Sequence, residues 1–168
     1  WGADNIMDLS TGKHIHSYMG HTDNAYCVAM CGGRLFSSGR DETVRMWDIE
    51  STKCLASFKG HGGYICKMAV CRNLLVTCSG DRSIRLWDPS QIERESVPTP
   101  VITFTGHSAD VRCLAVYEDY LFSGSDDRQI RCWSSQSKEC IKLLEGHTMK
   151  IFGLKTLSSS TPDKIMLA

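Results

Sequence analysis

Four residue types recur along this 168-residue chain at one fixed spacing, and this recurrence is the strongest constraint on its fold. Counting from His107, Ser123 follows sixteen residues later, Asp127 twenty and Trp133 twenty-six. The same offsets recur after two upstream histidines. These copies are His21 with Ser37, Asp41 and Trp47, and His61 with Thr77, Asp81 and Trp87. Three matching copies indicate that the chain is built from repeated units.

The spacing of the histidines sets the length of the unit. His21 and His61 are 40 residues apart, His61 and His107 are 46, and His107 and His147 are 40. A period of about 40 residues is typical of an architecture in which each unit packs on its neighbours. The chain therefore divides into a partial unit at 1–20, full units at 21–60, 61–106 and 107–146, and a truncated unit at 147–168.

Each unit favours short strands over helices. In the third unit, β-rich runs cover 111–116, 120–123, 129–133 and 140–144, with polar turn residues between them. Neither face of these runs is consistently polar, which predicts sheets that are buried on both faces. Four-stranded sheets stacked face to face around an axis would achieve this. The prediction is an all-β fold with three complete four-stranded blades and two partial ones.

The two partial units extend this pattern. Aligning Met7 with Trp47 makes the first twenty residues the tail of a preceding blade with a shortened hairpin. After His147, we expect a first strand near 151–156, a turn at 158–162 and a second strand that contains Ala168.

The middle unit carries an insertion of six residues between Trp87 and His107. Prolines and charged residues near 89–100 predict a projecting polar loop there. The Thr99-Pro100 dipeptide is a candidate phosphorylation site, although a solvated linker is the simpler interpretation.

Composition narrows the functional classes. The 19 Lys and Arg residues balance 19 Asp and Glu residues, so no summed field attracts nucleic acid or a membrane surface. No apolar run is long enough to span a bilayer, and the first residues do not resemble a signal peptide. We expect an intracellular protein, cytoplasmic or nuclear, that binds neither nucleic acid nor membranes.

Six of the nine cysteines follow the repeat register, and none forms a disulfide or zinc pattern in the sequence. Equivalent positions hold the pairs Cys27 and Cys113, Cys31 and Cys71, and Cys54 and Cys140. Register-matched thiols are typical of small buried hydrophobic residues. Hence we expect no metal and no cofactor.

The order Gly-His, Ser/Thr-x-x-x-Asp and Trp-Asp at this period resembles the WD40 repeat, with Ser134 in place of the last aspartate in the third unit. The resemblance implies a β-propeller, commonly with seven blades, of which this chain would be a segment. An alternative is a four-blade ring closed by pairing of the strands after His147 with residues 1–19.

The resemblance also implies a hydrogen-bond relay inside each blade, from the tryptophan indole to the hydroxyl, the histidine and the aspartate. A buried indole N–H and a buried carboxylate each need a partner, and neutral imidazole can donate at one nitrogen and accept at the other. Histidine, serine and aspartate also form hydrolase triads, but three copies and the absence of a G-x-S-x-G elbow favour a structural role. No catalytic residue is expected.

An arginine stands two residues before the tryptophan of each full unit, at Arg45, Arg85 and Arg131. This repetition predicts structural salt bridges between strands or blades.

Function is expected where the repeats differ. The resemblance places one rim of the propeller three and five residues after each histidine and one before each relay aspartate. Those positions hold Asn24, Tyr26, Arg40, Tyr64, Cys66, Gly80, Asp110, Arg112, Asp126, Lys150 and Phe152. Tyrosine, phenylalanine and arginine are common in binding hot spots. This rim predicts a protein or peptide partner rather than a small-molecule substrate, unless Tyr26 and Phe152 only pack under neighbouring loops.

A finer resemblance concerns the short turn at 31–35, which is similar to repeats of F-box/WD and RING-type ubiquitin-ligase receptors. Rim arginines of F-box/WD receptors bind phosphorylated degrons, and Arg40 and Arg112 match two such positions. The match is partial, because the two lie in non-adjacent units and Asp126 flanks Arg112. The leading prediction is a non-enzymatic interaction scaffold. The alternatives are a phosphodegron-reading part of a ligase receptor and purely structural blades.

Overall fold

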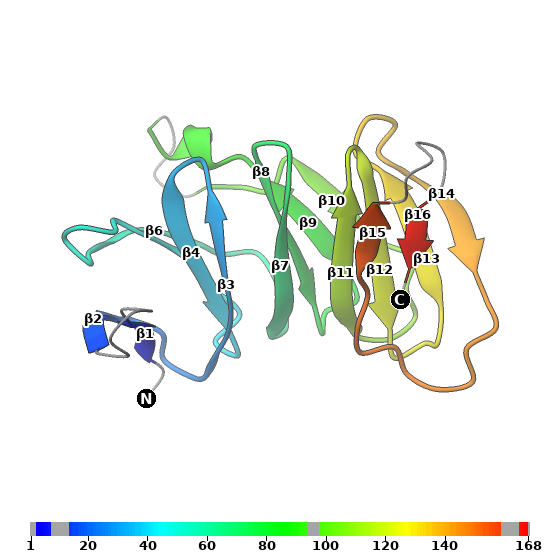
Figure 1. The fold of residues 1–168 in the computed structure, drawn as a ribbon, viewed down its shortest axis with the longest axis horizontal. Coiled ribbons are helices and arrows are strands. Elements are labelled where there is room, and N and C mark those ends of the chain that lie inside the picture. Colours follow the sequence, from blue (N-terminus) through cyan, green and yellow to red (C-terminus); the bar gives the residue numbers. More distant parts are fainter. Residues whose placement is uncertain (1–2, 8–13, 94–97, 159–164, 168) are drawn as a thin grey trace.

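The structure, a computed structural model, describes residues 3–7, 14–93, 98–158 and 165–167, which form five antiparallel sheets, with the three four-stranded ones side by side (Figure 1). Three sheets have four strands each, joined in chain order as simple meanders. No α-helix occurs in the described part of the chain, where the one helical element is the 3-10 helix η1 (Pro89–Glu93). This arrangement confirms the predicted all-β fold with three complete blades.

The strands of the three blades occupy equivalent positions in the repeat. The first sheet contains β3 (Ala25–Cys31), β4 (Arg34–Gly39), β5 (Val44–Trp47) and β6 (Cys54–Phe58). The second contains β7 (Ile65–Cys71), β8 (Leu74–Ser79), β9 (Ile84–Trp87) and β10 (Ile102–Phe104). The third contains β11 (Val111–Tyr117), β12 (Tyr120–Ser125), β13 (Ile130–Ser134) and β14 (Glu139–Leu144).

Two short hairpins flank the four-stranded sheets, one at the left end of the view and the other drawn over the third sheet (Figure 1). One pairs β1 (Ala3–Met7) with β2 (His14–Met19), and the other pairs β15 (Thr156–Ser158) with β16 (Ile165–Leu167). Because β1 and β2 form a sheet separate from β15 and β16, the described strands do not close the alternative four-blade ring. They form an open arc of blades.

The fourth unit differs from the sequence prediction. Instead of a strand near 151–156, only Thr156–Ser158 is a strand, because its partner β16 offers three residues for pairing. The preceding residues lie beside the third sheet, where Ile151 N donates to Ser125 O at 3.2 Å. The predicted turn at 158–162 falls mostly outside the described residues, as does Ala168.

The insertion of the middle unit begins with η1 rather than with an irregular loop. Pro98 is buried and Thr99 is exposed where the chain returns to β10. Arg94 and Glu95, which contributed to the prediction of a polar loop, lie outside the described residues.

Aromatic contacts join each blade to the unit before it. Tyr18, on β2, packs against Trp47 with ring centroids 5.5 Å apart, and Phe58, on β6, packs against Trp87 at 5.7 Å. Phe104, on β10, meets Trp133 at 5.3 Å. All three tryptophans are almost completely buried, so each is a core residue between two neighbouring units.

The cysteines are all free, and they divide by strand. Cys31, Cys71 and Cys113, on the first strands, are buried between sheets as predicted. The prediction of burial was wrong for Cys54 and Cys140, which are exposed because they lie on the outermost strands, and Cys27 is only partly buried.

Candidate functional site

The four recurring residues of the third blade form a continuous hydrogen-bonded chain. Trp133 Nε1 donates to Ser123 Oγ at 2.8 Å, Ser123 Oγ lies 2.7 Å from His107 Nε2, and His107 Nδ1 lies 2.7 Å from Asp127 Oδ2. The first blade repeats this chain at 2.8, 2.7 and 2.8 Å, and the second at 2.9, 2.7 and 2.7 Å with a threonine hydroxyl. The structure thus brings together all twelve predicted relay residues in three separate sets of four.

Proton positions in the relay follow from its acceptors. An ionised carboxylate can only accept, so His107 Nδ1 must carry the proton and Nε2 must accept from Ser123. Burial by itself would raise the pKa of Asp127, but hydrogen bonds from His107, Gln129 N and Ser108 N hold that pKa below its ordinary value. Burial lowers the pKa of His107, against the influence of Asp127. The pair is therefore a neutral imidazole and a carboxylate at neutral pH.

Sequence reasoning missed the residue two positions after each relay aspartate. Thr43 Oγ1 donates to Asp41 at 2.8 Å, and Ser83 Oγ donates to Asp81 at 2.6 Å. In the third blade Gln129 contributes its backbone N–H at 3.0 Å. A hydroxyl residue two after the aspartate in two units was the available signal, since such side chains close turns of this kind.

The relay serves as support rather than as an active site. Ser37, Thr77 and Ser123 have no exposed surface, and each hydroxyl accepts a tryptophan indole N–H. A substrate carbonyl cannot approach such an oxygen. The order Ser–His–Asp resembles a hydrolase triad, but the arrangement satisfies buried polar groups and joins two strands to two turns.

The three arginines before the tryptophans only partly form the predicted salt bridges. Arg85 lies 3.7 Å from Asp81, whereas Arg45 and Arg131 have no ion pair among the described residues. Arg131 instead packs over the Trp133 ring, with its Cζ 6.0 Å from the ring centroid. Their prediction as ion-pair residues was wrong for Arg45 and Arg131. Both guanidinium groups lie against the glycine before a relay histidine, Gly20 and Gly106, and only that of Arg131 also lies over the tryptophan ring.

Five of the predicted rim residues line one pocket of about 410 Å³. They are Tyr26, Arg40, Tyr64, Cys66 and Arg112. These residues meet because β3, β7 and β11 are the first strands of adjacent sheets, so the beginnings of the three strands lie at the same edge of the arc (Figure 1).

Two tyrosines form one side of this pocket. The Tyr26 and Tyr64 rings meet edge to face, with centroids 6.4 Å apart, and the Arg112 guanidinium lies over Tyr64 at 5.4 Å. The Tyr64 hydroxyl donates to Asp110, and burial together with this hydrogen bond raises the pKa of Tyr64 to about 12. Tyr64 is thus fixed, while Tyr26 keeps 48% of its surface exposed and offers an aromatic edge to a partner.

Acidic side chains surround the second arginine of the pocket. Arg112 Nε and Nη2 donate to the two oxygens of Asp126 at 2.9 and 2.8 Å, and Nη2 also donates to Asp110 at 3.2 Å. Lys150 Nζ donates to Asp126 at 2.7 Å. Hydrogen bonds from Arg112 and Lys150 lower the pKa of Asp126 to about 2. This network links the second and third blades with the fourth unit and leaves little unbalanced charge.

The remaining rim positions do not line the pocket directly. Asn24 O and Tyr64 O accept the backbone N–H groups of Arg40 and Gly80, which holds the two turns in place. An added Cβ at Gly80 would lie 2.7 Å from the Tyr64 ring, so only glycine fits there without a shift. Phe152 is 71% exposed, and the structure shows no ring contact for it with another described aromatic residue. Burial raises the pKa of Cys66 to about 11, so its thiol stays protonated.

Among the described residues, no group of three or more His, Cys, Asp or Glu side chains could hold a metal ion. No described helix is both long and apolar enough to cross a bilayer.

Stacked four-stranded sheets, each stabilised by a Trp–Ser/Thr–His–Asp relay, define a propeller-type repeat protein. The family described as "WD domain, G-beta repeat" (WD40) matches residues 12–48, 52–88 and 98–134, which is more than half of the chain. The chain therefore belongs to the WD40 family. Each matched segment ends on the third strand of a blade, so that 52–88 runs from the outer strand β6 of one blade to β9 of the next.

Within the family, one local similarity is to transducin-like enhancer protein 2 of Mus musculus. The two are 39% identical over 46 residues, which is 26% of this chain and 6% of that protein. The chain thus spans a small part of the length of the relative it matches, and the similarity is confined to a stretch about as long as one repeat.

Proposed function

We propose that this WD40 chain is a non-enzymatic protein-interaction scaffold whose rim binds an extended, unmodified peptide or loop of a protein partner. The observation that carries the proposal is the pocket between Tyr26, Arg40 and Tyr64, where a half-exposed aromatic ring and a loosely paired guanidinium face the same space. Aromatic and arginine side chains on a rigid framework provide much binding energy at a low entropic cost. The proposal includes a place for these blades in a larger ring, and an intracellular site of action that suits nine free thiols.

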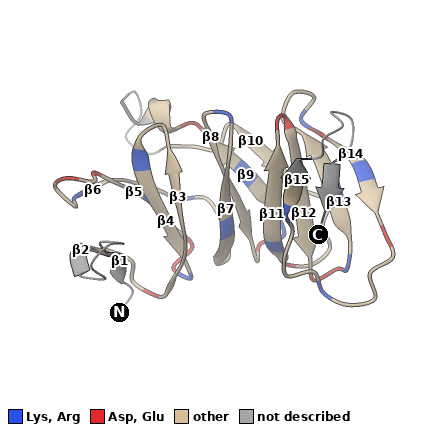
Figure 2. Ribbon diagram, viewed as in Figure 1, with Lys and Arg blue, Asp and Glu red and all other residues tan. Residues whose placement is uncertain are grey.

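Charge balance at the rim supports an unmodified ligand. Asp126 and Asp110 already bind Arg112, and their carboxylates would repel an incoming phosphate. Arg40 is 60% exposed and lies 3.7 Å from Asp23, so it is only loosely paired. Basic and acidic residues are interspersed over the arc without a stripe of one sign (Figure 2), which also argues against nucleic acid. The phosphodegron-reading alternative therefore requires Arg112 to leave two acidic partners.

Binding of peptide pools tests this proposal. Fluorescein-labelled pools of random peptides, one with phosphoserine fixed at its centre and one with serine, are titrated against the chain at low and high salt. The serine pool should bind at least as well as the phosphoserine pool, with a shallow salt dependence. Tyr26→Ala should weaken binding about tenfold, whereas Tyr120→Ala, a similarly exposed tyrosine at the other end of the strands, should not.

Each alternative predicts a different result. Tighter binding of the phosphoserine pool, lost on Arg40→Ala and Arg112→Ala, would replace the proposal with phosphopeptide recognition and revive the ligase-receptor hypothesis. Binding that is absent, or indifferent to Tyr26→Ala and Arg40→Ala, would favour purely structural blades whose ring binds its ligand elsewhere.

A further inference from the structure

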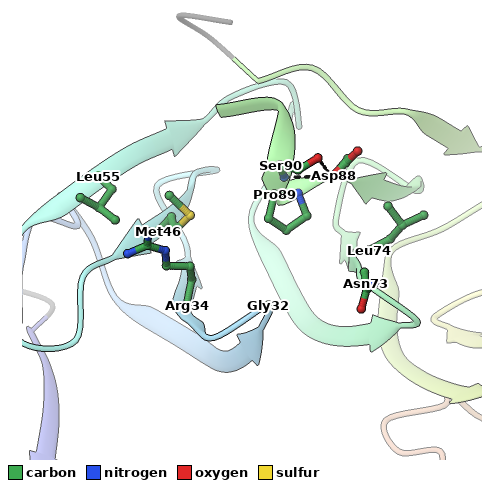
Figure 3. Close-up of a pocket in the computed structure, with 9 residues that line it drawn as sticks. All are labelled: Gly32, Arg34, Met46, Leu55, Asn73, Leu74, Asp88, Pro89 and Ser90. Carbon is green, nitrogen blue, oxygen red and sulfur yellow. Dashed lines mark hydrogen bonds between the residues drawn. The ribbon is translucent and has the colours of Figure 1, made fainter. Parts of the chain in front are cut away.

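A second hollow of about 830 Å³ lies between the first and second sheets, at the opposite end of the strands from the rim. One wall carries Arg34, Met46 and Leu55, and the other carries Leu74, Asp88 and Pro89, as Figure 3 shows. We refer to these six residues as the inter-blade groove. Part of its second wall comes from the start of η1, in the segment where the middle unit is six residues longer than the others.

The equivalent junction between the second and third sheets is bridged. There Arg72, in the β7–β8 turn, forms an ion pair with Asp119, in the β11–β12 turn, and Gln136 also donates to Asp119 at 2.6 Å. At the first junction the position of Arg72 is taken by Gly32, and that of Asp119 by Asn73. No ion pair therefore joins the two turns among the described residues, and the groove remains open. Cys31 Sγ, at the end of β3, donates to Asn73 O at 3.4 Å, as Cys71 Sγ does to Glu118 O at 3.2 Å at the second junction.

A second replacement also distinguishes the first junction from the second. In the third sheet, Ser135 N donates to Asp119 O at 2.9 Å and its hydroxyl to the same oxygen at 3.1 Å. In the second sheet this register holds Pro89, which has no N–H to donate. Its ring instead forms part of the groove wall (Figure 3).

The apolar side chains indicate one part of the ligand. Met46 is nearly buried at the base, while Leu55 is 43% exposed on the outer strand β6. With Pro89 they form an apolar surface that gains from covering by one aliphatic or aromatic side chain, whereas the Leu74 side chain packs against the core between the second and third sheets.

The charges indicate the other part. Arg34 is already paired with Asp48 at 3.4 Å, so it contributes little net positive field. Asp88 accepts from Ser90 N and Ser90 Oγ at 2.9 and 2.7 Å, but it has no ion pair among the described residues. The groove therefore has an unbalanced carboxylate beside its apolar surface, and no cation free to receive a phosphate or an acidic side chain.

We propose that the inter-blade groove is a second docking site, for a short peptide that carries an apolar side chain next to a lysine or arginine. The apolar side chain would cover Leu55 and Met46, and the cation would pair with Asp88. This site is separate from the rim and goes beyond the function proposed for it, because neither set of residues occurs in the other.

The test uses fluorescein-labelled nonapeptide pools with leucine fixed at the centre and arginine or glutamate fixed at the next position. The arginine pool should bind about fivefold more tightly than the glutamate pool, and Asp88→Asn should remove this preference. Asparagine keeps the oxygen that accepts from Ser90, so the turn should persist. Leu55→Ala should weaken binding about tenfold, whereas Ile141→Ala, at the same register of the outer strand β14, should leave it unchanged.

A closing variant tests the origin of the groove directly. Gly32→Arg combined with Asn73→Asp would copy the Arg72–Asp119 bridge into the first junction, and Arg72 shows that arginine adopts this turn, with φ of 54° against 55° at Gly32. A Cβ at Gly32 would meet no atom within 4 Å, so the double variant should fold and lose binding of the arginine pool. Tyr26→Ala should leave this binding intact, which separates the groove from the rim.

Three results would overturn the proposal. They are equal or absent binding of the two pools, an equal loss for Leu55→Ala and Ile141→Ala, and full binding by a folded closing variant. Loss of binding on Tyr26→Ala alone would assign the peptide to the rim instead.

Discussion

Removal of the Asp127 carboxylate should destabilise the third blade several times more than removal of the Arg112 guanidinium. Asp127 accepts from His107 Nδ1 at 2.7 Å and from Ser108 N and Gln129 N at 3.0 Å each. The His107 side chain has no exposed surface, so Asp127→Ala leaves its Nδ1–H without a partner and without water.

The expected size follows from these contacts. An unpartnered buried donor costs about 1–3 kcal/mol, and each of the two backbone donors, which water can partly reach, adds about 0.5 kcal/mol. We expect Asp127→Ala to lower the free energy of unfolding by about 3 kcal/mol. Arg112→Ala removes partly exposed ion pairs worth about 1 kcal/mol in total, and Asp126 keeps Lys150 as its partner.

Urea unfolding followed by tryptophan fluorescence measures both losses. Trp47, Trp87 and Trp133 are buried reporters, one in each blade. Asp23→Ala, at a 44% exposed carboxylate, serves as the control and should change stability by less than about 0.5 kcal/mol. Equal losses for Asp127→Ala and Arg112→Ala, at unchanged urea dependence, would refute the division between a supporting relay and a binding rim.

Three further perturbations have definite expected outcomes. Gly106→Ala should lower the free energy of unfolding by about 1–2 kcal/mol more than Gly146→Ala in the same assay. Both glycines have positive φ, but only at Gly106 would the added Cβ come within 3.0 Å of Arg131. Trp133→Phe should lower the free energy of unfolding by about 1–2 kcal/mol, seen as a lower thermal midpoint, because the Ser123 hydroxyl loses its indole donor. Stability should fall as the pH drops below about 6.5, where unfolded chains protonate a histidine that burial keeps neutral at His107. It should fall again below about 4, where the lowered pKa of the relay aspartates no longer favours the folded state; a flat profile from pH 7.5 to 3.5 would contradict both steps.

The fold was predictable because its signals are local and repeated. The offsets from each histidine placed the units, and polar turn residues separated strands such as β11 and β12 at nearly the observed boundaries. His147 shares this spacing and is exposed, and the position sixteen residues after it lies outside the described residues.

Other features depend on contacts between units and were not predictable from spacing. Arg45 and Arg131 share a register with Arg85, yet their surroundings decide whether an ion pair forms. Cys54 and Cys140 also share a register, but burial depends on the position of their strand within the sheet, not on its sequence. Local pattern therefore specifies each sheet, while the neighbouring sheet determines what a given side chain contacts.

The same reasoning explains why the rim and the inter-blade groove are the places where binding should be sought. A position that holds the same type of residue in every unit makes the same contacts each time, as the relay residues do. Gly32 and Pro89 lie at positions that differ between units, and they stand where Arg72 and Ser135 hydrogen-bond to Asp119 at the second junction. Because the first junction lacks the ion pair that joins the turns at the second junction, its apolar and acidic side chains remain uncovered. The open groove is thus the consequence of two specific replacements, and restoring the bridge should remove it without disturbing the relays that hold the blades together.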